Sequence, residues 1–385
     1  MADSRLSAGE AGDAAGGVDA AADAAVARAW PWSFVDCLSL ASGAVVDAVV
    51  LAIMKGPWAH PSAADIERLA GEVKASHALY HSLGWLERPE EFHCVPPPLR
   101  DIELAPGRRW PIAHQWLSFT SGYEPHRQDP AAARWQSYES NRIAHAWMLR
   151  GDDDAPWLVC LHGSGTGHPL FDAAGFGARR LHAALGLNLL FPVQPLHGPR
   201  RAPQTGTAAF LSFELLDTVH GFAQAVWEAR RLVRWLRDQG ARRVGVYGIS
   251  LGGYTAALLA TLEPVDFVLA GIPLCDIPDL YVGHSPVRMR ERAEALGLLG
   301  RELRELFTLI SPLARPPTAP RDCRFLFAAL ADRIVPPTQA KRLWEHWERP
   351  PMSWYPGGHV SFFWTPSVQR FVEAALRRAG FVHRR

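Results

Sequence analysis

Residues 244–253 have the sequence Val-Gly-Val-Tyr-Gly-Ile-Ser-Leu-Gly-Gly, which contains the pattern G-x-S-x-G centred on Ser250. A strand-like apolar run, Val244–Tyr247, precedes the serine, and a helical run, Tyr254–Leu262, follows it. A serine on a sharp strand-to-helix turn is typical of a nucleophile elbow, and small residues at Gly248 and Gly252 let the two backbones approach each other beneath it. The alternative is an ordinary glycine-rich turn in which Ser250 caps the helix. The pattern favours Ser250 as a nucleophile.

A serine nucleophile needs a histidine base and a carboxylate that orients the histidine. Asp332 follows the apolar run Phe325–Ala331, and His359 follows a Pro-Gly-Gly turn after the last strand-like run. Both lie at the ends of predicted strands, so we expect them to meet Ser250 at one edge of the sheet. Asp276, after the preceding strand-like run, is an alternative acid, although it can also cap a following helix.

Two backbone N–H groups are needed to bind the oxyanion that forms during acyl transfer. Leu251, directly after the nucleophile, is expected to supply one. The other is expected from Ser164, in the glycine-rich loop Leu161–Gly167, with His162 bracing that loop. The same glycines could cradle a phosphate, but the loop lacks both G-K-[ST] and G-x-G-x-x-G, which disfavours nucleotide binding.

Short apolar runs alternate with longer amphipathic ones from about residue 111 onward, which is typical of a sheet with crossover helices. The strand-like runs are Gln115–Phe119, Ile143–Leu149, Trp157–Leu161, Leu187–Pro192, Val244–Tyr247, Phe267–Ile272, Arg324–Leu330 and Ser353–Tyr355. Residues 219–236 carry one apolar stripe at helical spacing, which predicts a crossover helix. The sequence therefore predicts an α/β fold with a mostly parallel, eight-stranded sheet and helices on both faces.

Three further segments flank or interrupt this predicted domain, which spans residues 111–385. Residues 1–29, rich in Ala and Gly, are expected to form a disordered tail. Residues 30–110 are expected to form a helical N-terminal extension, with helices at Leu40–Met54 and Ser62–Leu83. Residues 276–317 interrupt the strand alternation with an Arg- and Glu-rich helical segment, which we expect to form a lid above the carboxyl edge of the sheet.

Composition narrows the classes of function. Forty Lys and Arg against 39 Asp and Glu leave a net charge of +1, which gives no electrostatic reason to expect a nucleic-acid partner. The five cysteines show neither metal-ligand spacing nor a disulfide framework, so we expect no metal and no cofactor. The apolar run Leu38–Met54 is interrupted by Asp47 and is shorter than the ~20 residues of a membrane-spanning helix, so a buried helix is favoured over a membrane-surface one. The N-terminus lacks the pattern of a signal peptide, so we expect a cytoplasmic protein, with peripheral membrane contact and the oligomeric state left open.

Several motifs together resemble the α/β-hydrolase superfamily across roughly residues 111–385, and these are Gly248–Gly253, Leu161–Gly165, the Asp332 turn and Gly358-His359. The run Pro195–Arg201 and the helical segment Trp227–Trp235 are more narrowly similar to a bacterial α/β-hydrolase group, and more loosely to α/β hydrolase domain-containing protein 18. The resemblance implies an α/β-hydrolase fold and a Ser-Asp-His triad, and it implies no particular ligand. Residues 30–100 lie outside the motifs that carry it.

The expected function is hydrolysis of carboxylic esters through an acyl-enzyme on Ser250, as in a carboxylesterase or a lipase-like enzyme. The substrate is expected to be a small-molecule or lipid ester. Transfer of the acyl group to an alcohol and a non-catalytic binding module are the alternatives. Arg200 and Arg201 follow the fourth predicted strand, where a guanidinium pair can bind a carboxylate or phosphate of the substrate. A structural salt bridge to the core or the lid is the favoured interpretation for these arginines, and substrate binding is the alternative.

Overall fold

A computed structural model of the chain describes residues 34–55, 61–107, 112–202 and 210–382. The predicted tail, residues 1–29, lies outside these ranges. The strands are β1 Ile102–Pro106, β2 Gln115–Thr120, β3 Ile143–Leu149, β4 Trp157–Leu161, β5 Asn188–Val193, β6 Val244–Ile249, β7 Phe267–Gly271, β8 Arg324–Ala329 and β9 Met352–Tyr355. The helices are α2 Phe34–Lys55, α3 Ala63–Ser82, α4 Pro89–Phe92, α5 Ala132–Gln136, α6 Pro169–Gly175, α7 Leu215–Asp238, α8 Leu251–Leu262, α9 Ile277–His284, α10 Val287–Ala295, α11 Arg301–Thr308, α12 Pro337–His346 and α13 Pro366–Arg378. A π-helical turn spans Arg180–Ala184, and a 3-10 segment spans His359–Trp364.

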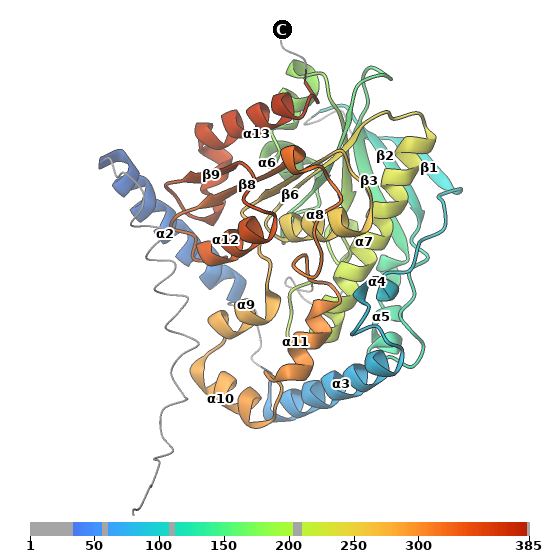
Figure 1. The fold of residues 1–385 in the computed structure, drawn as a ribbon, viewed down its shortest axis with the longest axis vertical. Coiled ribbons are helices and arrows are strands. Elements are labelled where there is room, and N and C mark those ends of the chain that lie inside the picture. The colour runs from blue at the N-terminus through green and yellow to red at the C-terminus, as the bar shows by residue number, and fades with distance from the viewer. Residues whose placement is uncertain (1–33, 56–60, 108–111, 203–209, 383–385) are drawn as a thin grey trace, which may run out of the picture.

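The strands form one sheet in the order β1-β2-β3-β5-β4-β6-β7-β8-β9 (Figure 1). Strands β4 to β9 pair in parallel, whereas β1, β2 and β3 form an antiparallel edge that joins the parallel part at β5. The predicted α/β architecture with a mostly parallel sheet is confirmed. The predicted number of strands is wrong, because β1 lies in the segment that was expected to be helical and pairs with β2.

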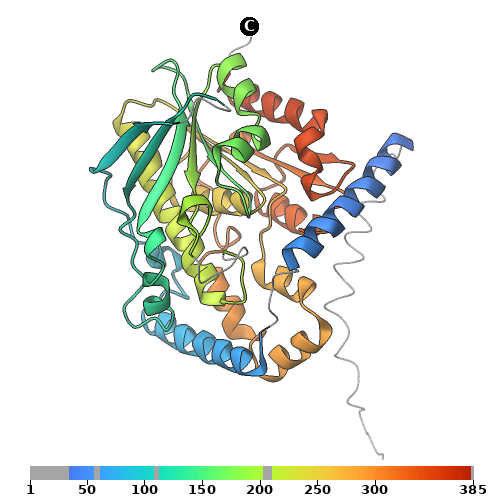
Figure 2. The ribbon, with the colours of Figure 1, turned by 180° about the vertical axis from the view of Figure 1, so that it is seen from behind.

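Alternating side chains of the central strands pack into two apolar layers, one on each face of the sheet. In β6, for example, Val244 and Val246 belong to one layer, and Tyr247 and Ile249 belong to the other. Helices α7 and α8 cover the first face, while α6 and α13 cover the second, as the two opposite views show (Figures 1 and 2). The parallel strands are therefore covered on both faces, as their continuous apolar sequences predict.

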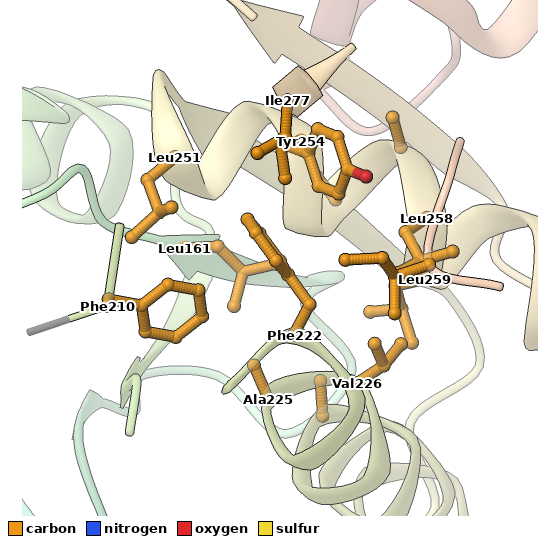
Figure 3. Packing of buried hydrophobic residues seen from close by; sticks show 14 of the residues in the cluster. Leu161, Phe210, Phe222, Ala225, Val226, Leu251, Tyr254, Leu258, Leu259 and Ile277 are labelled. Atoms are coloured by element: carbon orange, nitrogen blue, oxygen red, sulfur yellow. The ribbon is translucent and has the colours of Figure 1, made fainter. Parts of the chain in front are cut away.

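Helix α8, which starts directly after Ser250, is buried along almost its whole length. Phe222 of α7 points toward Tyr254 of α8, and the centroids of their rings are 4.3 Å apart (Figure 3). Phe210 packs edge-on against Phe222 at 4.7 Å. This packing fixes the start of α8 relative to the sheet, and so it fixes the turn that carries Ser250.

The predicted insertion, residues 276–317, contains α9, α10 and α11. Its apolar residues Leu303 and Leu306 are buried, and both α10 and α11 contact α3 at the side of the molecule away from α13 (Figure 1). Nε2 of His77 on α3 lies 2.6 Å from Oε2 of Glu305 on α11. The insertion and α3 thus bury their apolar faces against one another.

Helix α2 lies along the outside of the molecule, beside the end of the sheet formed by β8 and β9 (Figures 1 and 2). Within residues 39–51, whose side chains the structure describes, only Gly43 and Asp47 are buried, and Val45 and Val49 are exposed. The preference for a buried helix is therefore wrong for most of this segment. Among the described residues, no helix is both long enough and apolar enough to cross a membrane.

Candidate active site

Ser250 lies on the turn between β6 and α8 with φ 57° and ψ −117°, a left-handed conformation that is strained for a residue with a side chain. Its backbone N–H donates a hydrogen bond to the Gly271 carbonyl at 2.8 Å. The two glycines of the pattern have no room for a side chain, because a Cβ at Gly248 would lie 1.9 Å from the Gly252 carbonyl oxygen, and one at Gly252 would lie 1.8 Å from that of Leu161. The close packing of strand, turn and helix thus holds the serine in this strained conformation.

The Ser250 side chain makes no capping hydrogen bond to α8. Its Oγ instead lies 2.8 Å from Nε2 of His359. On the other side of the ring, Nδ1 lies 2.6 Å from Oδ2 of Asp332. Since an ionised carboxylate can only accept, Nδ1 carries the proton and Nε2 is left to accept the serine hydroxyl. The structure therefore brings together the three residues that the sequence singled out, in a hydrogen-bonded chain from carboxylate to imidazole to hydroxyl.

The second carboxylate oxygen of Asp332 accepts the N–H groups of Ile334 at 2.9 Å and Val335 at 2.7 Å. This turn aims Oδ2 at the histidine. The pKa of Asp332 is raised because burial disfavours its charged form, although the nearby His359 and the Val335 N–H act in the opposite direction.

Burial lowers the pKa of His359, but the charge of Asp332, the hydrogen bond to it and the charge of Asp47 outweigh burial. The net pKa of His359 is therefore raised above its ordinary value of 6.5. A raised pKa makes the imidazole a better proton acceptor in the pH range where it is neutral.

Beside the hydrogen-bonded residues Asp332, His359 and Ser250 lies a cavity of about 170 Å³, and both Ser250 and His359 line it. Its apolar walls come from residues on several elements, Val50, Phe171, Phe176, Ile249, Ile272, Ile334, Val360, Phe362 and Phe363. The glycine-rich loop after β4 forms one side, and a Cβ built on Gly163 would lie 3.6 Å from the Ser250 Cβ. Ser164 lines the same cavity. None of the lining residues belongs to the segment 276–317, so the expected lid does not close this cavity in the structure.

His162 braces the glycine-rich loop, as expected from the sequence. Its Nε2 accepts the Gln194 N–H at 3.0 Å, and Nδ1 donates to the Gly163 carbonyl at 2.8 Å. Burial lowers the pKa of His162 to about 4, so the ring is neutral near pH 7. Asp172 also lines the cavity and accepts the Gly167 N–H at 3.2 Å, and burial raises its pKa to about 6.

The carboxylate of the alternative acid, Asp276, is bonded to Asp279 and Arg342 instead of His359. It caps α9 by accepting the Asp279 N–H at 3.1 Å, and it pairs with Arg342 at 2.9 Å. These contacts occupy both carboxylate oxygens and give Asp276 a structural role.

Arg200 forms a buried salt bridge, as the favoured interpretation expects, and the alternative of substrate binding is wrong for this residue. Its side chain is fully buried, and both terminal guanidinium nitrogens donate to the Glu228 carboxylate at 2.7 Å. One of these nitrogens also reaches the Asn141 carbonyl at 3.0 Å. Arg200 thus tethers the loop after β5 to α7. The side chain of Arg201 is exposed, and its contact with a substrate stays a prediction.

Sequence reasoning missed Asp47 of α2, whose buried carboxylate accepts the His359 N–H at 2.7 Å and the Arg333 N–H at 3.1 Å. The only signal in the sequence is that Asp47 is the single acidic residue of the run Leu38–Met54. Its partners lie about 300 residues further along the chain, so no local pattern could identify them.

Comparison with known proteins agrees with this architecture. The family model described as Alpha/beta hydrolase domain containing 18 matches residues 132–276. An uncharacterized protein of Mycobacterium tuberculosis is 39% identical over 348 residues, covering 90% of this chain and 84% of the relative, and its counterpart from a second strain matches equally well.

Solved structures agree at the level of the fold. An acetyl xylan esterase from Paenibacillus sp. R4 superposes with a TM-score of 0.53, 16% identity, and coverage of 75% of this chain and 93% of that chain. Acetyl xylan esterase 1 from Thermoanaerobacterium sp. JW/SL YS485 gives a TM-score of 0.50, again with 16% identity, over 77% of this chain and 92% of that chain. Identities this low support a common fold and carry no information on the substrate.

Proposed function

The chain belongs to the α/β-hydrolase superfamily, and from this premise we propose that it is a serine hydrolase that cleaves carboxylic esters with short acyl groups. The observation that carries the proposal is the hydrogen-bonded chain of Asp332, His359 and Ser250 beside an apolar cavity. The strain at Ser250 adds support, because the fold holds this residue against its backbone preference.

In the proposed reaction, Ser250 Oγ attacks the ester carbonyl carbon while its proton passes to Nε2 of His359. The carbonyl oxygen becomes an oxyanion, which we expect the backbone N–H groups of Leu251 and Ser164 to bind. Leu251 is the first residue of α8, so its N–H has no acceptor within the helix. Collapse of the tetrahedral intermediate breaks the ester bond, and the leaving alcohol takes the proton from His359. An acyl-Ser250 ester remains.

Water then attacks the acyl-enzyme, and His359 again takes the proton. The second tetrahedral intermediate expels Ser250 Oγ, which recovers its proton from His359, and a carboxylic acid is released. Throughout the cycle Asp332 holds the imidazole in one tautomer and stabilises the imidazolium. The charge of Asp332 therefore stabilises the imidazolium during both acylation and deacylation.

The cavity sets the size of the acyl group. A cavity of about 150 Å³ with apolar walls binds one benzene molecule, and the cavity beside Ser250 has about 170 Å³. It can therefore hold an apolar group of roughly six carbon atoms. We infer a preference for acyl groups from acetyl to about hexanoyl.

Hydrolysis of p-nitrophenyl esters with two to twelve acyl carbons tests the proposal, with Ser250→Ala as the control for reaction at any other residue. We expect kcat/KM to be highest at six or fewer acyl carbons and turnover to be lost in Ser250→Ala. Equal turnover by Ser250→Ala would contradict the proposed mechanism, and a rising trend up to twelve carbons would contradict the size limit.

A further inference from the structure

The backbone of helix α2 lies directly against the backbone of the loop that carries His359. A Cβ on Gly43 would lie 2.2 Å from the Gly358 nitrogen, and a Cβ on Gly358 would lie 2.4 Å from the Gly43 carbonyl oxygen. Neither glycine can therefore gain a side chain unless the helix and the loop separate. One turn further along the same face is Asp47, followed by Val50, which lines the cavity beside Ser250.

The Asp47 carboxylate links the loop that carries Asp332 to the loop that carries His359. Its Oδ2 accepts the N–H of His359 at 2.7 Å and the N–H of Arg333 at 3.1 Å, while Oδ1 lies 3.4 Å from the Val360 nitrogen. Arg333 directly follows Asp332, so one carboxylate fixes the backbone beside both members of the Asp332–His359 pair. Hydrogen bonds to an ionised carboxylate are roughly twice as strong as neutral ones.

The position of Asp47 is costly for a purely structural residue. Its side chain is fully buried, and a buried charge is destabilising unless it is compensated. The described partners of its carboxylate are backbone N–H groups, and none of them is a cationic side chain. The negative charge is therefore available to stabilise the imidazolium that forms on His359 when it takes the serine proton.

We propose that Asp47 is a positioning residue for the Asp332–His359 pair, and that α2 is a working part of the active site. This inference rests on the proposed function. It assigns to the N-terminal extension the tasks of setting the distance between acid and base and of placing a second negative charge behind the imidazole.

Three variants test this role. Asp47→Ala removes the acceptor and the charge, whereas Asp47→Asn keeps one acceptor oxygen and removes the charge. Val49→Ala, on the exposed face of the same helix, is the matched control. Because misplacement by about 1 Å can cost on the order of 100-fold in rate, we expect Asp47→Ala to lower kcat about that much with little change in KM. Asp47→Asn should lose less, and Val49→Ala should match the wild type.

A second measurement separates positioning from stability. Several titratable groups surround His359, namely Asp332 after β8, Asp47 on α2, Tyr355 of β9, and Asp172 and His162 across the cavity. Of these, only Asp47 changes in Asp47→Asn. The pKa of His359, followed by NMR of its ring protons in a Ser250→Ala background, should fall in this variant. The acidic limb of kcat/KM should move to lower pH by the same amount.

The possible outcomes are distinguishable. Wild-type kcat and an unmoved His359 pKa in folded Asp47→Asn and Asp47→Ala would overturn the inference. It would also be overturned if these variants had a lower melting temperature, a lower kcat and a higher KM while the pKa of His359 stayed unchanged. A loss of structure alone would produce that pattern. If Asp47→Ala fails to fold, the Asp47→Asn titration decides alone. An inactive wild-type protein would contradict the proposed function, whereas the NMR titration would still report on Asp47.

Discussion

Phe363→Ala should lengthen the acyl chain that the protein accepts. The Phe363 ring lies between the cavity beside Ser250 and a second cavity of about 570 Å³, which is bordered by α6, the π-helical turn and α13. The two cavities share Gly175, Phe176, Phe362 and Phe363 as wall residues. A Cβ built on Gly175 would lie only 3.2 Å from the Phe363 ring, so the ring closes against the backbone of α6.

The expected magnitude follows from the burial of methylene groups. Each methylene that leaves water for an apolar cavity stabilises the bound state by about 0.8 kcal/mol, which corresponds to roughly a fourfold gain in kcat/KM. In Phe363→Ala, the ratio of kcat/KM for decanoyl over butanoyl esters should therefore rise about fourfold for each methylene that enters the second cavity. The second cavity has more than three times the volume of the first, so several methylenes can enter it.

The assay is the p-nitrophenyl ester series, measured for the wild type, Phe363→Ala and Trp364→Ala. Trp364 is the neighbouring aromatic residue and is 61% exposed, and it lines neither cavity, so its loss should leave the chain-length ratio unchanged. The reasoning is refuted if Phe363→Ala keeps the wild-type ratio while its melting curve shows a folded protein. An equal shift in Trp364→Ala would also refute it, because the effect would then be unspecific.

The remaining predictions concern the nucleophile, the base and the buried ion pair. Ser250→Ala and His359→Ala should each lower kcat by several orders of magnitude, and the double variant should be little worse than either, because these residues act as a unit; additive losses measured in a double-variant cycle would contradict this. Because the pKa of His359 is raised and the neutral ring is the active form, kcat/KM should increase with pH with a midpoint above 6.5, and Asp172→Asn should leave this midpoint in place. Arg200→Met should destabilise the fold by about 3–5 kcal/mol in urea unfolding, because it leaves the Glu228 carboxylate buried and unpaired, whereas an unchanged midpoint of unfolding would show that the pair is dispensable.

The parts of the fold that were predicted correctly are those with strong local patterns. Strands β2 to β9 match the eight predicted runs to within two residues at each end. For β4 to β8, burial within the parallel part of the sheet leaves continuous apolar sequence. Strand β1 was missed because it is a short edge strand that is exposed at most positions and ends at Pro106. Among the described strands it pairs with β2 alone, and such pairing has no local signature.

The predicted positions of the site residues also agree with the structure where the strand pattern decides a position, and they differ from it where tertiary packing decides it. Ser250, Asp332 and His359 each follow a strand, so the topology of a parallel sheet was enough to bring them to one edge. The sequence placed Arg200 near that edge, but it could not show that Glu228, on the next helix, faces it across the core. The insertion was expected to cover the site, and instead its apolar side chains are buried in the layer shared with α3. These contacts depend on tertiary packing between distant segments.

Labelling with a fluorophosphonate, followed by peptide mapping, tests the central claim most directly. Such a probe reacts with a serine hydroxyl that a neighbouring base activates, and it needs no knowledge of the natural substrate. We predict one adduct per chain, located on Ser250, that forms in the wild type and is absent from Ser250→Ala and strongly slowed in His359→Ala. An unlabelled but folded wild-type protein, or an adduct on any other residue, would contradict the assignment of Ser250 as the nucleophile.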